Sequence, residues 1–189
     1  MGFKERLIKN DFVFGALIGI AFTCSNTHIL AQKVSKVEII NADSFEFDED
    51  LGNGAKRLLG HVQFKQDDVL MFSDSAYYYD NNALDAFGNI HINQNDSVHL
   101  YGDFLKYNGN TKLASVTGKV VTLKDKDMTL TTTKLDFNMQ TNIGYYNNKG
   151  KIVTKENTLT SQHGYYYSSQ KNLFFKKDEV LINPDYKMY

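Results

Sequence analysis

The segment Phe72–Ile92 reads FSDSAYYYDNNALDAFGNIHI and contains the three features that decide the fold. Asp74 stands four residues before Tyr78, an asparagine pair follows at Asn81-Asn82, and Gly88 opens a Gly-x-Ile-x-Ile tail. Asparagine and glycine favour tight turns because they tolerate left-handed backbone conformations. The apolar residues around them alternate with polar ones, which is the period of a β-strand. The segment therefore predicts a β-hairpin whose returning strand bends at Gly88.

These features recur along the chain at intervals of about 30 residues, which indicates a repeat architecture. The spacing of Asp74 and Tyr78 recurs at Asp43 and Phe47, Asp103 and Tyr107, Thr133 and Phe137, and His163 and Tyr167. The glycine tail recurs at Gly60-His61-Val62, Gly118-Lys119-Val120 and Gly150-Lys151-Ile152, and more loosely at Asp178-Glu179-Val180. In such architectures each unit buries its apolar face against its neighbours.

The fold class follows from the periods and the turns. No stretch after residue 31 shows a sustained helical period, so we predict an all-β fold. Long antiparallel strands joined by hairpins would bend near their middles, at Ser73-Asp74 in one direction and at Gly88 in the other. Because a bent strand contributes to two sheets, we predict an open β-jellyroll of stacked rungs, shaped like a taco shell.

The first residues have the pattern of an export signal rather than of a folded element. Lys4, Arg6 and Lys9 precede the apolar run 12–22, which has about half the length of a membrane-spanning helix. We predict a cleaved signal peptide over residues 1–31 and the repeat domain over residues 32–189. The alternatives are lipidation at Cys24 and an uncleaved membrane anchor.

Composition argues against several classes of function. The formal net charge of −1 leaves no basic surplus for phosphates, so we expect no nucleic-acid partner. Cys24 is the only cysteine, so the exported chain would have no disulfide. No motif for nucleophilic, phosphate-binding or dinucleotide chemistry is present, and we expect neither enzyme activity nor a cofactor.

The polar residues of the repeat also have a structural explanation. His61, His91, His99 and His163 lack the spacing of metal ligands, so we expect no metal site. The aspartates that share one repeat position, such as Asp74, are expected to cap corners by hydrogen-bonding the backbone rather than to bind calcium.

The inward-facing residues are the candidate binding residues, because they share one phase of the repeat. We predict that these side chains line one apolar trough: Val62, Phe64, Met71, Tyr78, Ile90, Ile92, Leu100, Leu105, Tyr107, Val120, Leu130, Leu135, Phe137, Ile152, Tyr167 and Val180. The same residues would also serve an ordinary β-core, and the sequence does not distinguish a trough from a core.

The repeat resembles that of the OstA-like family, whose fold is that of LptA and is shared with LptC and the N-terminal domain of LptD. The resemblance rests on Ser73–Tyr78 and on Leu84–Ile90, and it extends over nearly the whole repeat domain. Thr133 and His163 replace the aspartate, and Asp178 replaces the glycine, so the last units depart from the pattern.

This resemblance implies transport of lipopolysaccharide across the periplasm, with acyl chains held in the groove between two sheets. It also implies docking to proteins of the same fold, or to further copies of this chain, through edge strands. Two alternatives stay open: an exported structural or carbohydrate-binding β-repeat, and the N-terminal part of a larger outer-membrane assembly protein. Because Lys187-Met188-Tyr189 matches the start of a further unit, we expect the natural chain to continue past Tyr189.

Overall fold

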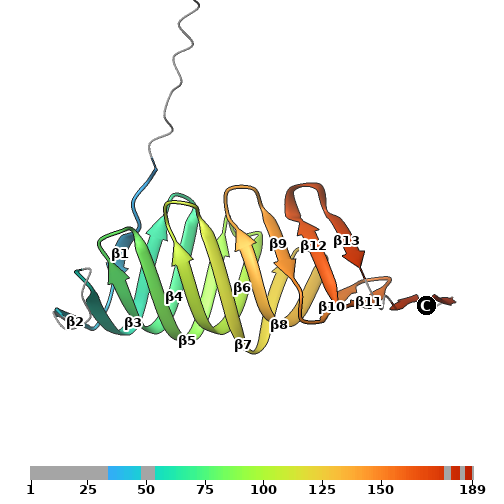
Figure 1. Cartoon of the computed structure of the whole chain (residues 1–189), viewed down its shortest axis with the longest axis horizontal. Helices are drawn as coiled ribbons and strands as arrows, with labels where there is room; N and C mark the ends of the chain where they lie inside the picture. The colour runs from blue at the N-terminus through green and yellow to red at the C-terminus, as the bar shows by residue number, and fades with distance from the viewer. Residues whose placement is uncertain (1–33, 48–53, 177–179, 184–185, 189) are drawn as a thin grey trace, which may run out of the picture. The chain divides into compact units, whose positions relative to one another are not determined.

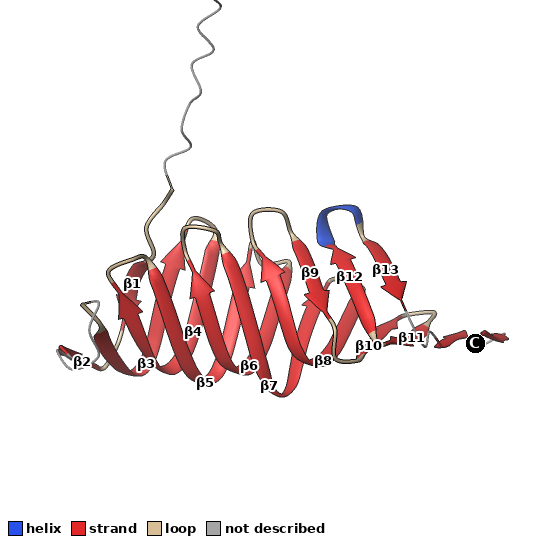
Figure 2. Cartoon of the chain, viewed as in Figure 1, coloured by secondary structure: helices blue, strands red, loops and turns tan. Residues whose placement is uncertain are grey.

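A computed structural model describes residues 34–47, 54–176, 180–183 and 186–188. The predicted signal peptide and Cys24 lie outside the described residues. The regular elements of the described residues are all strands, apart from one short 3-10 turn, which confirms the all-β prediction (Figure 2). The strands are β1 Glu38–Asn41, β2 Ser44–Phe47, β3 Lys56–Gln66, β4 Val69–Tyr79, β5 Ala83–Gln94, β6 Val98–Asn108, β7 Leu113–Asp125, β8 Met128–Asn138, β9 Ile143–Tyr146, β10 Gly150–Thr154, β11 Thr158–Ser161, β12 His163–Tyr167, β13 Asn172–Lys176, β14 Val180–Asn183 and β15 Tyr186–Met188, with η1 at Ser168–Gln170. Among these residues, no helix is long and apolar enough to span a membrane.

The strands form one antiparallel sheet in which β3 to β8 pair in sequence order, as the predicted hairpins require (Figure 1). β3 to β8 are long and continuous, whereas later strands are interrupted midway. β8, for example, pairs with β10 along one half and with β9 along the other. The interrupted pairs β9/β10 and β11/β12 therefore continue the stack of rungs.

Each long strand changes register near its middle, and these shifts lie at the bends that the sequence predicts. The β4–β5 pairing shifts between Phe72 and Ser75, and the β5–β6 pairing shifts between Phe87 and Ile90. The shifts divide every rung into two arms. β6 contains one inward leucine in each, so we name them the Leu100 arm and the Leu105 arm.

The repeated aspartates hold the corners between the arms. Asp74 accepts hydrogen bonds from the side-chain amide of Asn89, at 2.9 and 3.1 Å, beside Gly88 in the next strand. Asp103 accepts a 2.8 Å hydrogen bond from the backbone N–H of Lys119. Capping of the backbone is therefore confirmed for Asp103. For Asp74 the expected backbone bond is wrong, because its partner is the side chain of Asn89.

Gly88 has φ +73°, and a Cβ there would lie 2.3 Å from Asp74 Oδ2. We expect Gly88→Ala to lower the free energy of unfolding by about 1–3 kcal/mol, because it strains the backbone and displaces the capping carboxylate. Urea unfolding measures the loss.

Gly118→Ala is the control, since the φ of Gly118 lies outside the left-handed region and its nearest contact is longer, at 2.8 Å. An equal loss in both variants would contradict the corner argument.

Candidate functional site

The two arms face each other across an apolar interior. Most residues predicted to point inward are buried there, with 0–2% of their surface exposed: Val62, Phe64, Met71, Ile90, Ile92, Leu100, Leu105, Tyr107, Leu130, Leu135, Phe137 and Ile152. Tyr78 is partly buried against the same core, and its hydroxyl donates a 3.1 Å hydrogen bond to the carbonyl of Val37. The inward placement of these residues is confirmed.

The prediction for Val120 is wrong. Val120 is 61% exposed, whereas Val121 is fully buried. In β5 the inward residues on the two sides of the corner are Ala86 and Ile90, but in β7 they are Val116 and Val121. The β7 corner thus contains one more residue, which turns Val120 toward solvent and brings Val121 inward.

The prediction for Tyr167 is also wrong, because Tyr166 is the inward residue and is 3% exposed. Tyr166 pairs with Gly144, which pairs with Phe137, whereas Tyr167 pairs with Ile143. The corner of this rung is set by Ser161, which is 1% exposed and hydrogen-bonded to Tyr146. Ser161 thus takes the place that Ser73 has in β4, and the capping position that follows it is Gln162 rather than His163.

The placement of Val180 is the third error. Val180 pairs with Thr160, which pairs with Lys151. Lys151 is exposed and neighbours the buried Ile152, so this row of residues belongs to the outer face. The glycine of the tail motif is replaced by Asp178 in this unit, and the spacing carried over from the other units does not hold.

The interior is filled rather than open. Side chains such as Leu123, Leu130 and Leu135 have no exposed surface, so not even a water-sized probe reaches them. An acyl chain is wider than a water molecule. The trough expected from the sequence is therefore a packed core between β3 and β8 in this conformation.

At the edge opposite the corners, three buried polar residues join the arms. Gln66, Gln94 and Asp125 end β3, β5 and β7 in the Leu100 arm, and they are 2%, 6% and 7% exposed. Each reaches the end of a strand in the Leu105 arm. We call this edge the mouth and the three contacts the first, second and third latch.

The first and third latches are fully hydrogen-bonded. Gln66 donates to the carbonyl of Gly109 at 2.8 Å and accepts from the Tyr107 hydroxyl at 2.5 Å. Asp125 accepts from the hydroxyls of Tyr166 at 2.6 Å and Ser168 at 2.5 Å. Burial raises the pKa of both tyrosines, so their hydroxyls stay protonated and donate.

The second latch is incomplete. Gln94 donates to the carbonyl of Met139 at 2.9 Å, but its buried Oε1 has no hydrogen-bond partner among the described residues. Phe137 occupies the position that Tyr107 has in the first latch and that Tyr166 has in the third. The missing phenolic hydroxyl explains the unpaired oxygen.

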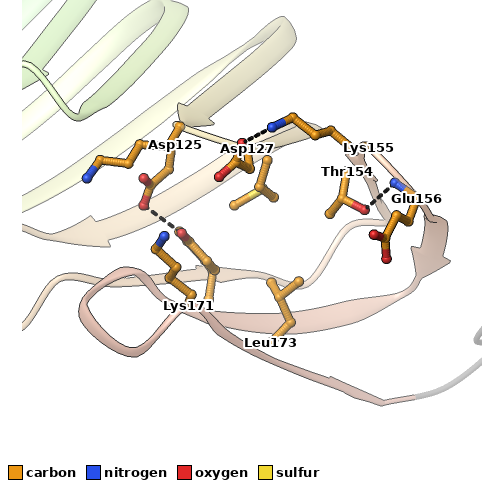
Figure 3. Close-up of a pocket in the computed structure, with 10 residues that line it drawn as sticks. Asp125, Asp127, Thr154, Lys155, Glu156, Lys171 and Leu173 are labelled. Atoms are coloured by element: carbon orange, nitrogen blue, oxygen red, sulfur yellow. Dashed lines mark hydrogen bonds and ion pairs between the residues drawn. The ribbon is translucent and has the colours of Figure 1, made fainter.

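Clefts adjoin the mouth beyond the second latch. One of about 260 Å³ is lined by residues that include Gln94, Asp125, Asn142 and Ser168. A second, of about 360 Å³, lies next to the third latch and includes Met128 and Leu173 (Figure 3). Asp127 and Lys155 form a 2.7 Å ion pair at its rim, as Figure 3 shows.

Lys126 and Lys171 line both clefts. Neither makes a salt bridge within the described part of the chain. The mouth beyond the second latch therefore combines apolar side chains with lysines and with the carboxylates of Asp125, Asp127 and Glu156.

The histidines of the described residues lie at corners and on the outer face. No group of histidine, cysteine, aspartate and glutamate side chains is arranged to hold a metal ion there. His91 stacks on Tyr101 on the outer face, with ring centroids 4.6 Å apart, and burial lowers its pKa. His61 bonds the Asp43 carboxylate at a corner, which raises the histidine pKa.

The latch residues were missed because the sequence reading assigned them to turns. A signal was present, since Gln66 and Gln94 both stand directly before an acidic or amide turn pair and Asp125 stands in the same repeat position. A long polar residue at the end of an inward row can cross the mouth only if the opposite arm lies close. That distance depends on how sharply the corners bend.

The first latch supplies a direct test of the closure. We expect Tyr107→Phe to lower the free energy of unfolding by about 1–3 kcal/mol, because it leaves the buried Oε1 of Gln66 unpaired. Chemical unfolding measures the loss. Tyr77→Phe is the control, since Tyr77 lies on the outer face and no hydrogen bond of its hydroxyl is seen. A loss no larger than in the control would show that the hydroxyl does not hold the mouth.

Comparison with known proteins places the chain in a family. The family model described as OstA-like protein matches residues 34–189. No curated protein sequence matches the chain. A similar solved structure is LptH, the LptA homologous periplasmic component of the lipopolysaccharide transport device from Pseudomonas aeruginosa. It is 13% identical, and the match covers 76% of this chain and 83% of that chain with a TM-score of 0.48. The family match spans most of the chain, and the chain therefore belongs to the OstA-like proteins.

Proposed function

We propose that this protein binds lipopolysaccharide and passes it across the periplasm as part of a bridge to the outer membrane. Membership of the OstA-like family supports the class of function. The observation that carries the proposal is a continuous apolar row along the inside of the Leu100 arm. Its members pair from strand to strand without interruption: Phe64, Met71, Ile92, Leu100, Leu123, Leu130, Ile152 and Leu159.

A continuous row matters because lipid A must cross an aqueous compartment without exposing its chains. Rungs repeat at about 4.8 Å, so the row extends for roughly 34 Å. Moving one CH₂ group from water to an apolar site is worth about 0.8 kcal/mol, and a long acyl chain is therefore worth on the order of 10 kcal/mol. An interrupted row would leave part of the chain in water at each transfer.

The packed interior requires that the arms part before a chain can enter. Within the described residues, the arms are joined by sheet at the corners and by side chains at the mouth. Parting them breaks latch hydrogen bonds, worth about 0.5–1.5 kcal/mol each when neutral and about 1.5–3 kcal/mol when charged. Acyl chains inserted between the arms would cover the apolar surface that parting exposes. Their transfer free energy is larger than the sum of the latches.

The proposed role is binding and transfer rather than catalysis. The buried polar residues Gln66, Gln94 and Asp125 serve closure, and the inward rows are apolar. The proposed location is the periplasm, reached through the signal peptide predicted over residues 1–31.

A carbohydrate-binding repeat is the second candidate, and one observation favours it. Tyr145, Tyr165 and Phe174 pair side by side on the outer face of β9, β12 and β13. The Tyr145 and Tyr165 rings lie 4.6 Å apart, beside a cleft of about 330 Å³ that includes His163 and Lys176. Aromatic rows of this kind can stack on sugars. Loss of polysaccharide binding in Tyr165→Ala, with lipid binding absent, would favour this candidate.

Photo-crosslinking tests the main proposal at neighbouring positions. We expect photo-leucine at Leu105, which faces the core, to capture lipopolysaccharide in cells. Photo-lysine at Lys106, the next residue on the outer face, serves as the matched control. Immunoblotting for lipopolysaccharide reads out the adduct. Adducts only at Lys106 would rule out transport between the arms.

The proposed partners are proteins of the same fold, including further copies of this chain, that add strands to the edges. Among the described strands, β1 and β2 pair only with β3. β2 also presents two exposed aromatics, Phe45 and Phe47, at 55% and 66% exposure. An unpaired edge with apolar side chains favours strand addition.

We expect the average mass in light scattering to rise with protein concentration. The double variant Phe45→Lys, Phe47→Lys should stay monomeric, because charges on an edge strand oppose pairing. A wild-type protein that is monomeric at every concentration, and that forms no crosslinks through β2, would contradict this docking mode.

A further inference from the structure

We infer that the mouth is a gate that parts first at its second latch, Gln94 to Met139, and that an acyl chain enters the interior there. The inference rests on the proposed function for the identity of the lipid. The order of opening rests on the hydrogen bonds of the three latches alone.

The three latches differ in strength although they share one repeat position. The first has an amide with both its donor and its acceptor used, through Gly109 and Tyr107. The third has a carboxylate with two hydroxyl donors, and a charged acceptor makes stronger hydrogen bonds. The second has one hydrogen bond, from Gln94 to Met139.

The unpaired oxygen of Gln94 also favours opening of the second latch. Closure removes water from Oε1 of Gln94 and supplies no donor from the described part of the chain in its place. Opening returns that oxygen to water. An unpaired buried acceptor therefore raises the free energy of the closed state at this latch relative to its neighbours.

The surroundings of this latch suit an amphipathic ligand. The 260 Å³ cleft begins at Gln94 and continues toward the third latch. Lys126 and Lys171 line it and make no salt bridge in the described residues. Asp125 also lines it, but its carboxylate accepts the hydroxyls of Tyr166 and Ser168. Their ammonium groups would receive the anionic head group of a glycolipid while its chain passes Gln94 into the core.

Two substitutions exchange the properties of the first and second latches. Phe137→Tyr supplies the missing hydroxyl to Gln94, and Tyr107→Phe removes the same hydroxyl from Gln66. Both are made in the full repeat domain, and circular dichroism confirms that each variant folds. The two variants differ from the wild type by one oxygen atom each, so each serves as the control for the other.

Opening is measured without lipid, from distances between spin labels across the mouth. The predicted signal peptide contains the only cysteine, so introduced pairs are unique in the exported chain. Ser97→Cys with Thr141→Cys reports on the second latch, and Asp68→Cys with Thr111→Cys reports on the first. We expect the wild type to show a longer-distance, open population mainly at the second latch.

Phe137→Tyr should lower that open population about tenfold, which corresponds to roughly 1.4 kcal/mol. Tyr107→Phe should raise the open population at the first latch and leave the second unchanged. Equal open populations at both latches in the wild type, or no response of the second latch to Phe137→Tyr, would overturn the inference.

Lipid uptake is measured as the rate at which photo-leucine at Leu105 captures purified lipopolysaccharide after mixing. We expect Phe137→Tyr to slow capture several-fold and the outer-face variant Tyr77→Phe to leave it within about twofold. A short bis-maleimide bridge across the Ser97–Thr141 pair should abolish capture, whereas a bridge across the Asp68–Thr111 pair should not. The bridges test the gate even if the added hydroxyl does not fit.

The outcomes separate this inference from the proposed function. Capture at equal rates in all variants and both bridged forms would overturn the gate and leave lipid transport standing. Label distances that respond as expected, without capture of lipopolysaccharide by any form, would overturn the proposed function. The gate would then remain, but its ligand would not be this lipid.

Discussion

The structure depends on keeping one face of each strand inward on both sides of a sharp corner. Side chains alternate along a strand, so a slip of one residue at the corner turns a whole half-strand inside out. In strands that run toward the Leu105 arm, few residues separate the last inward residue before the corner from the first one after it, as from Ser73 to Ala76. In the returning strands this separation is one residue longer, as from Ala86 to Ile90, and Gly88 and Asn89 at the corner both have positive φ.

The corners also explain why the two edges of the stack behave differently. At the corners the backbone is continuous, and capping residues such as Asp74 bind the next strand. At the mouth, side chains such as Gln66 and Asp125 carry the closure. A hinge on one edge and a side-chain closure on the other are what a fold needs if it is to hold a lipid and release it. Under the proposed function, the packed core is the lipid-free state of the binding site.

The strands, turns and inward rows could largely be predicted from the sequence, because several copies of one pattern agree where a single copy would be ambiguous. A single hairpin such as 72–92 is compatible with many β-folds, but several copies in one phase define the rungs, the turns and the inward rows. The three misplaced residues show where this agreement ends. Tyr167 and Val180 follow corners whose marker residues differ from those of the earlier units. Val120 follows a corner that keeps its glycine but contains one more residue.

By itself, the sequence determined that the chain is a stack of bent antiparallel strands with apolar inward rows, because strand period and turn chemistry are local properties. It also showed the resemblance to the OstA-like family, through the motifs at Ser73–Tyr78 and Leu84–Ile90. Only the tertiary structure decided that the interior is packed shut and that Gln66, Gln94 and Asp125 close the mouth. These contacts join strands far apart in sequence, and their formation depends on the angle between the arms, which no local pattern encodes.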